Sequence, residues 1–96
     1  MLTSGQRKIL EAKAAQDRTI FQIGKGGLTQ NLLTSLKDAL KSRELIKINV
    51  LNNSESNAKE LIGELAKATE SEPVAVRGAK IILYKFSDKE GIEHIL

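Results

Sequence analysis

Three glycines and a lysine stand close together in the stretch IGKGGLT, residues 23–29. An apolar run precedes the stretch, and Thr29 is a good N-cap, so the glycines should lie between a strand and a helix start. Glycine lets a ligand approach the main chain without a Cβ in the way. The helix start adds unpaired N–H groups and partial positive charge, and Lys25 adds a cation. The stretch therefore has the chemistry to bind a phosphate group.

Two familiar nucleotide-binding loops do not fit this stretch. The P-loop spacing GxxxxGK[S/T] is absent, and the third glycine of GxGxxG would fall at Thr29. In addition, 96 residues leave little room for a dinucleotide-binding fold. Residues Gly24–Gly27 do match GxxG, which contacts the nucleic-acid backbone in KH-type modules. Glycines at this spacing are also common in turns, so the motif alone leaves a plain turn open.

No other group of residues has the pattern of a catalytic or metal site. His94 stands alone and is expected on the surface, and Glu60 and Glu64 are expected on a solvated helix face. The absence of cysteine excludes disulfides and thiolate metal ligands. We therefore expect no catalytic residue, no metal and no cofactor, and a protein that is not an enzyme.

The charge is distributed unevenly along the chain. Residues 1–53 carry nine Lys/Arg against four Asp/Glu, and residues 54–96 carry six against eight. This asymmetry predicts one electropositive face suited to a polyanion. The only aromatic residues are Phe21, Tyr84 and Phe86, which disfavours a sheet that stacks several bases; the last two are expected to pack. With no cysteine, leader or long apolar segment, we expect a soluble cytoplasmic protein of one domain.

Seven elements are expected to position these residues. Thr3 and Gln6 form a capping box at the start of a helix within residues 2–16, and residues 18–24 read as a short strand. A second helix begins at Thr29, followed by an alternating strand in residues 44–51. The cluster 52–56 opens a third helix, which ends before Pro73. Residues 73–86 read as two strands joined near residue 78.

The order αβαβαββ restricts the fold. Strand–helix–strand connections between parallel strands are right-handed and pack their helices on the sheet. The last hairpin adds an antiparallel strand. We therefore expect an α/β protein, specifically a two-layer sandwich.

Four ordered blocks in the sequence resemble the CRM domain (chloroplast RNA splicing and ribosome maturation), in particular its bacterial single-domain, YhbY-type members. The blocks are LTSGQRKIL, IGKGGLT, ELIKINVL and VRGAKIILYKF, and the resemblance covers about residues 2–87. It implies a mixed four-stranded sheet of order 1-2-4-3 with the last strand antiparallel and the helices on one side. This is similar to the C-terminal domain of translation initiation factor three. We expect a CRM-type domain in residues 1–87 and a C-terminal tail in 88–96.

The resemblance also implies a function in ribosome biogenesis. CRM domains bind structured RNA, and the bacterial members associate with precursors of the large ribosomal subunit. The family's GxxG loop falls on Gly24, Lys25, Gly26 and Gly27, with Leu28 and Thr29 completing the block. The flanking basic residues that we expect to extend the RNA contact are Arg7, Lys8, Lys37, Lys41 and Arg43. These also fit solvated helix faces, and the last two suit a helix C-terminus.

Two other functions stay open at this point. One is a KH-like regulator of other RNAs. The other is a protein-docking module that uses an exposed sheet or the apolar end IEHIL. In each case we expect a monomer.

Overall fold

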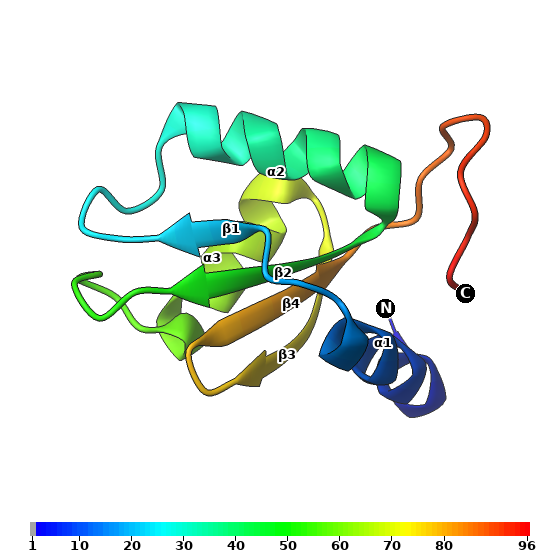
Figure 1. Ribbon diagram of the computed structural model, residues 1–96, viewed down its shortest axis with the longest axis horizontal. Helices are drawn as coiled ribbons and strands as arrows, with labels where there is room; N and C mark the ends of the chain where they lie inside the picture. The colour runs from blue at the N-terminus through cyan, green and yellow to red at the C-terminus, as the bar shows by residue number, and fades with distance from the viewer. Residues whose placement is uncertain (1) are drawn as a thin grey trace.

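A mixed four-stranded sheet is the framework of the protein in the computed structural model, which describes residues 2–96 (Figure 1). Its strands lie in the order β1-β2-β4-β3, with β1 parallel to β2, and β4 antiparallel to both β2 and β3. This arrangement confirms the expected α/β class, the strand order and the antiparallel last strand. The strands are β1 (Phe21–Ile23), β2 (Leu45–Val50), β3 (Glu72–Arg77) and β4 (Lys80–Tyr84).

The three helices start at side chains that cap them. They are α1 (Ser4–Gln16), α2 (Gln30–Arg43) and α3 (Ala58–Thr69). The capping box of Thr3 and Gln6 is confirmed, with the Gln6 N–H donating to Thr3 Oγ1 at 3.1 Å. Thr29 Oγ1 accepts from the Leu32 N–H at 3.1 Å at the start of α2. Asn57 caps α3 and forms a second capping box, in which Glu60 Oε1 accepts the Asn57 N–H.

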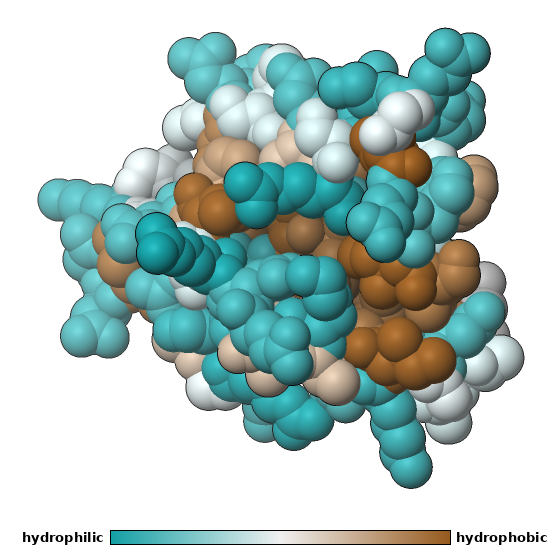
Figure 2. All heavy atoms as spheres, turned by 45° about the vertical axis from the view of Figure 1, so that its right-hand side comes forward, coloured by the Kyte–Doolittle hydropathy of each residue, from teal (hydrophilic) through white to brown (hydrophobic). Residues whose placement is uncertain are grey.

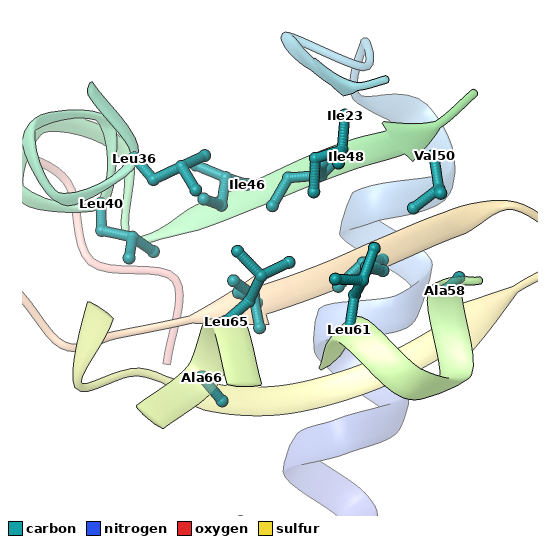
Figure 3. Close-up of a cluster of buried hydrophobic side chains, with 12 residues drawn as sticks. Ile23, Leu36, Leu40, Ile46, Ile48, Val50, Ala58, Leu61, Leu65 and Ala66 are labelled. Atoms are coloured by element: carbon teal, nitrogen blue, oxygen red, sulfur yellow. The ribbon is translucent and has the colours of Figure 1, made fainter. Parts of the chain in front are cut away.

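The larger part of the core lies between the sheet and helices α2 and α3 (Figure 3). Alternate residues of β2 point to this face, as the sequence pattern predicts, and each fully buried side chain of this size contributes about 1.5–3 kcal/mol. The core residues labelled in Figure 3 are Ile23, Leu36, Leu40, Ile46, Ile48, Val50, Ala58, Leu61, Leu65 and Ala66.

Helix α1 covers the opposite face of the sheet, so the expectation of helices on one side only, in two layers, is wrong for this helix. Leu10 and Ala14 are fully buried against a second cluster of sheet residues: Leu45, Val74, Ile82 and Tyr84. The physical reason is the unbroken apolar run of β4. Successive strand residues point to opposite faces, so Ile81–Tyr84 requires cover on both. α1 therefore adds a partial third layer.

The chain after Lys85 forms no helix or strand and is held by Glu44, the C-cap of α2. The Glu44 carboxylate is fully buried and accepts the N–H groups of Ser87 at 2.8 Å and Ile95 at 3.1 Å. His94 Nδ1 lies 2.8 Å from Glu44 Oε2. Burial alone would raise the pKa of Glu44, but these hydrogen bonds and the charge of His94 outweigh it and lower the pKa. The tail is thus fastened at three points.

Two side chains near the tail differ in burial. Tyr84 is buried as expected. Its pKa is raised mainly by burial and to a smaller extent by the negative charge of the nearby Glu44. Phe86, expected to pack, is instead 60% exposed and stacks its ring on His94 with the centroids 4.6 Å apart.

Across residues 2–96, no helix has the length and apolar character needed to cross a membrane.

Candidate nucleic-acid interface

The glycine-rich loop lies at one end of the sheet, where three connections meet (Figure 1). β1 and β2 are parallel, so the loops that follow them leave from the same end. The Leu51 N–H donates to the Ile23 carbonyl at 2.8 Å and joins the start of the second loop to the end of β1. The β3–β4 turn lies at this end too, because the Val50 N–H donates to the Ala79 carbonyl at 2.7 Å. The sheet therefore brings the starts of these connections together at one end.

The fold itself requires glycine at two of the three glycine positions. Gly24 and Gly27 close a turn in which the Gly27 N–H donates to the Gly24 carbonyl at 3.0 Å. Gly27 has φ of 64°, in the left-handed region that disfavours a side chain. A Cβ on Gly24 would lie 3.3 Å from both Asn53 Oδ1 and Leu51 Cδ1, which is a tight contact. Turn geometry and close packing explain these two positions.

The fold does not require glycine at residue 26. Its φ lies outside the left-handed region, and a Cβ built on it would have nothing within 4 Å. Gly26 and Lys25 are both exposed, and among residues 2–96 neither has a hydrogen-bonding partner. A missing side chain at Gly26 thus leaves its N–H open to a ligand that approaches from solvent.

The N-terminus of α2 continues this open surface. Thr29 Oγ1 and the Thr29 carbonyl accept from the N–H groups of Leu32 and Leu33. The N–H groups of Gln30 and Asn31 have no partner in the described part of the chain. The first turn of α2 contains no acidic residue, whereas α3 has Glu60 at the corresponding place. The positive end of the α2 dipole is therefore uncompensated and favours an anion.

The remaining residues of the predicted loop have mixed surroundings. Leu28 is half-buried and packs against the main core, so it anchors the loop. Thr29 is exposed, but its side chain acts as the helix cap. The groups of the loop that face solvent are thus chiefly the main chain of Lys25 and Gly26 and the Lys25 ammonium.

Helix α2 carries the predicted basic residues away from the loop. Lys37, Lys41 and Arg43 are all exposed. At 1.5 Å per residue, Lys37 lies about 12 Å from Thr29 along the axis, and Arg43 about 21 Å. The last two also occupy the final turn, where they complement the helix dipole. Lys37 is therefore the nearest of the three to the loop.

The structure does not bring Arg7 and Lys8 to the loop. The Arg7 Nη1 donates to the carbonyls of Pro73 at 2.6 Å and Val74 at 2.7 Å, at the β3 edge of the sheet. The loop follows β1 at the other edge, so the width of the sheet separates the two places. Lys8 is exposed on α1. Any contact that these residues make with RNA belongs to a separate surface.

Sequence reasoning missed the residues that border the loop. Asn53, in the connection between β2 and α3, lies against Gly24. Asn53 could have been predicted, because the carboxyl ends of neighbouring parallel strands meet at one edge of a sheet.

Residues 2–96 contain no cluster of three or more His, Cys, Asp or Glu able to hold a metal ion.

Comparison with known proteins gives consistent results. The model of the CRS1/YhbY (CRM) domain matches residues 2–85. The chain is 41% identical over 87 residues to "Probable RNA-binding protein YqeI" of Bacillus subtilis, covering 91% of each sequence. It is 26% identical to an "RNA-binding protein" of Haemophilus influenzae, over 96% of this chain and 93% of that one. Among solved structures it is similar to the solution structure of the hypothetical protein SAV1595 from Staphylococcus aureus. That match has a TM-score of 0.78 and 44% identity, over 97% of this chain and 98% of the other.

Proposed function

This chain belongs to the CRS1/YhbY (CRM) domain family, and we propose that it binds structured RNA through the glycine-rich loop and the start of α2. The relatives named as RNA-binding proteins support this assignment, since they match nearly the whole chain. The RNA that we propose is large-subunit ribosomal RNA in precursor particles, and the role is assembly by binding, without catalysis.

The exposed, unpartnered main chain of Lys25 and Gly26 is the observation that carries the proposal. A phosphate placed there accepts from these N–H groups and lies at the positive end of α2. Lys25 supplies a cation at the same place. Since the fold has no need of a glycine at residue 26, close approach by a sugar–phosphate strand accounts for it.

Helix α2 supports the same geometry over a longer distance. Lys37, and beyond it Lys41 and Arg43, neutralise further phosphates and release their counterions. Phosphate contacts carry no base information, so the specificity of these contacts comes from the shape of the RNA. Lys8 offers a second contact for an RNA large enough to reach the α1 side.

Sequencing of crosslinked RNA tests the proposed partner. The wild-type protein and a variant with Lys25→Glu and Gly26→Asp are crosslinked in cells and recovered at equal amounts. We expect enrichment of large-subunit ribosomal RNA with the wild type and its loss with the variant. Enrichment of messenger or small RNA instead would favour a KH-like regulator. Unchanged crosslinking of the variant would contradict the loop assignment.

A second candidate function, protein docking, is favoured by one observation. The large hydrophobic side chains that are most exposed, Ile9, Phe86 and Leu96, are 54%, 60% and 40% exposed. Apolar patches lie among polar side chains on the side that carries α1 and the tail (Figure 2). This side is remote from the glycine-rich loop, so both functions are compatible. Affinity capture with Phe86→Ser tests docking without touching the loop.

A further inference from the structure

A hollow of about 230 Å³ lies directly beside the glycine-rich loop. The loop, the β2–α3 connection and α3 border it, and it is open to solvent; its lining residues are Lys25, Gly26, Gly27, Leu28, Ser54, Glu55, Ser56, Leu61 and Glu64. A planar heterocycle can enter the hollow from its open side, with the sugar and phosphate left outside.

The hollow has an apolar side. Leu61 is buried and Leu28 is half-buried, and both belong to or pack against the main core. Leu61 and Glu64 are three residues apart on α3, so they lie on one face of the helix, with the leucine inward and the carboxylate exposed. The hollow therefore offers a flat ring an apolar contact, chiefly with Leu28, and the carboxylate of Glu64 belongs to the same lining.

The connection that forms the second wall is internally braced. The Ser54 N–H donates to the Leu51 carbonyl at 3.0 Å, and Ser54 Oγ donates to the Ser56 carbonyl at 2.8 Å. Asn57 and Glu60 then close the capping box of α3. These bonds hold Glu55 beside the hollow without using its carboxylate. The wall is thus in place before any ligand arrives.

Two carboxylates of the lining are unengaged. They are Glu55 and Glu64, which have no hydrogen-bonding or ionic partner among residues 2–96; Glu60, outside the lining, is used by the capping box. Negative charge there repels a phosphate, which is instead attracted to Lys25 and the start of α2. Carboxylates accept hydrogen bonds from N–H groups. The hollow therefore suits the part of a nucleotide that carries N–H donors and no charge, which is the base.

We propose that this hollow binds one unstacked RNA base, guanine in preference to the others, while the adjoining phosphate lies on the glycine-rich loop. Guanine presents two N–H donors side by side on its Watson–Crick edge, which one carboxylate accepts together. Adenine and cytosine present one amino group and uracil one imino group. Proteins read single-stranded bases on this edge. The inference rests on the proposed RNA binding and adds a base preference to it.

Hairpin RNAs with one variable loop base test the proposal. The stem is constant, the loop is seven uridines, and guanine is placed at each loop position in turn. At the best position guanine is replaced by inosine, which lacks the 2-amino group, and by adenine. Fluorescence anisotropy should give an affinity for guanine about five- to tenfold above that for inosine. This is the size expected for a typical hydrogen bond, because water competes for an exposed carboxylate and weakens the bond relative to one with a buried charge.

Isosteric variants connect the preference to the hollow. Glu64→Gln or Glu55→Gln should reduce the guanine preference to within about twofold, while binding still depends on Lys25. Glu70→Gln, which removes an exposed carboxylate beyond the far end of α3, is the matched control and should keep the preference. Two results overturn the base site alone. One is a guanine preference that survives both glutamate variants. The other is a wild-type protein without a guanine preference, although Lys25→Gln still abolishes RNA binding. RNA binding that ignores both Lys25 and Gly26 overturns the proposed function and the base site together.

Discussion

Alanine at Gly27 should destabilise the fold, whereas alanine at Gly26 should leave the fold stable and weaken RNA binding. Gly27 has φ of 64°, so a side chain there costs about 1–2 kcal/mol of stability. In a domain of this size that lowers Tm by about 4–8 °C per kcal/mol. At Gly26 a Cβ has nothing within 4 Å and the φ is ordinary. Gly26→Ala should therefore keep its stability or gain about 0.4–1 kcal/mol.

The effect of Gly26→Ala on RNA binding follows from the same open space. If a phosphate accepts from the main chain here, the new methyl group displaces it. The loss of one hydrogen bond to a charged acceptor costs about 1.5–3 kcal/mol, or at least tenfold in affinity. Thermal unfolding and anisotropy with one hairpin RNA measure the two effects on the same protein samples. A Gly26→Ala protein that is stable and binds RNA like the wild type would refute close approach of the backbone at Gly26.

Three further changes test separate parts of the account. For about four neutralised phosphates, log affinity should fall against log salt with a slope of about −3 to −4. Lys25→Gln should make this slope shallower by about 1, and an unchanged slope would show that Lys25 does not contact the RNA. Glu44→Gln should cost about 1–3 kcal/mol at pH 7, measured by denaturant unfolding. Because the folded-state pKa of Glu44 is lowered, its stabilisation is present above the ordinary value of 4.5 and disappears as pH falls through the folded pKa. The difference between wild type and variant should therefore shrink in acid, and a constant difference would contradict this. Arg7→Ala should cost about 1–3 kcal/mol of stability by freeing two carbonyls at the edge of β3, with RNA affinity within twofold; a large loss of affinity would restore Arg7 to the RNA contact.

Local patterns in the sequence predicted most of the fold. The capping box at Thr3, the N-cap at Thr29 and the alternation in β2 are each readable from a few neighbouring residues, and the structure confirms all three. The side of the sheet that α1 covers is a tertiary property. The apolar run of β4 was the only signal for it, since a strand with apolar residues on both faces needs cover on both.

The long-range polar contacts had no such signal. Glu44 meets Ser87, His94 and Ile95 across more than 40 residues of chain, and Arg7 meets Pro73 and Val74 across more than 60. No periodicity or spacing connects such residues. For the same reason Arg7 and the glycine-rich loop look like one basic region in the sequence, although they lie at opposite edges of the sheet.

Amide chemical shifts during an RNA titration test most directly whether the main chain of the glycine-rich loop and the start of α2 binds RNA. A ¹⁵N-labelled protein is titrated with the hairpin RNA, and each amide is followed. We expect the largest shifts at Lys25, Gly26, Gln30 and Asn31, whose N–H groups have no partner in the described chain. Shifts concentrated around the tail or α1, with these four amides unmoved at saturation, would contradict the account.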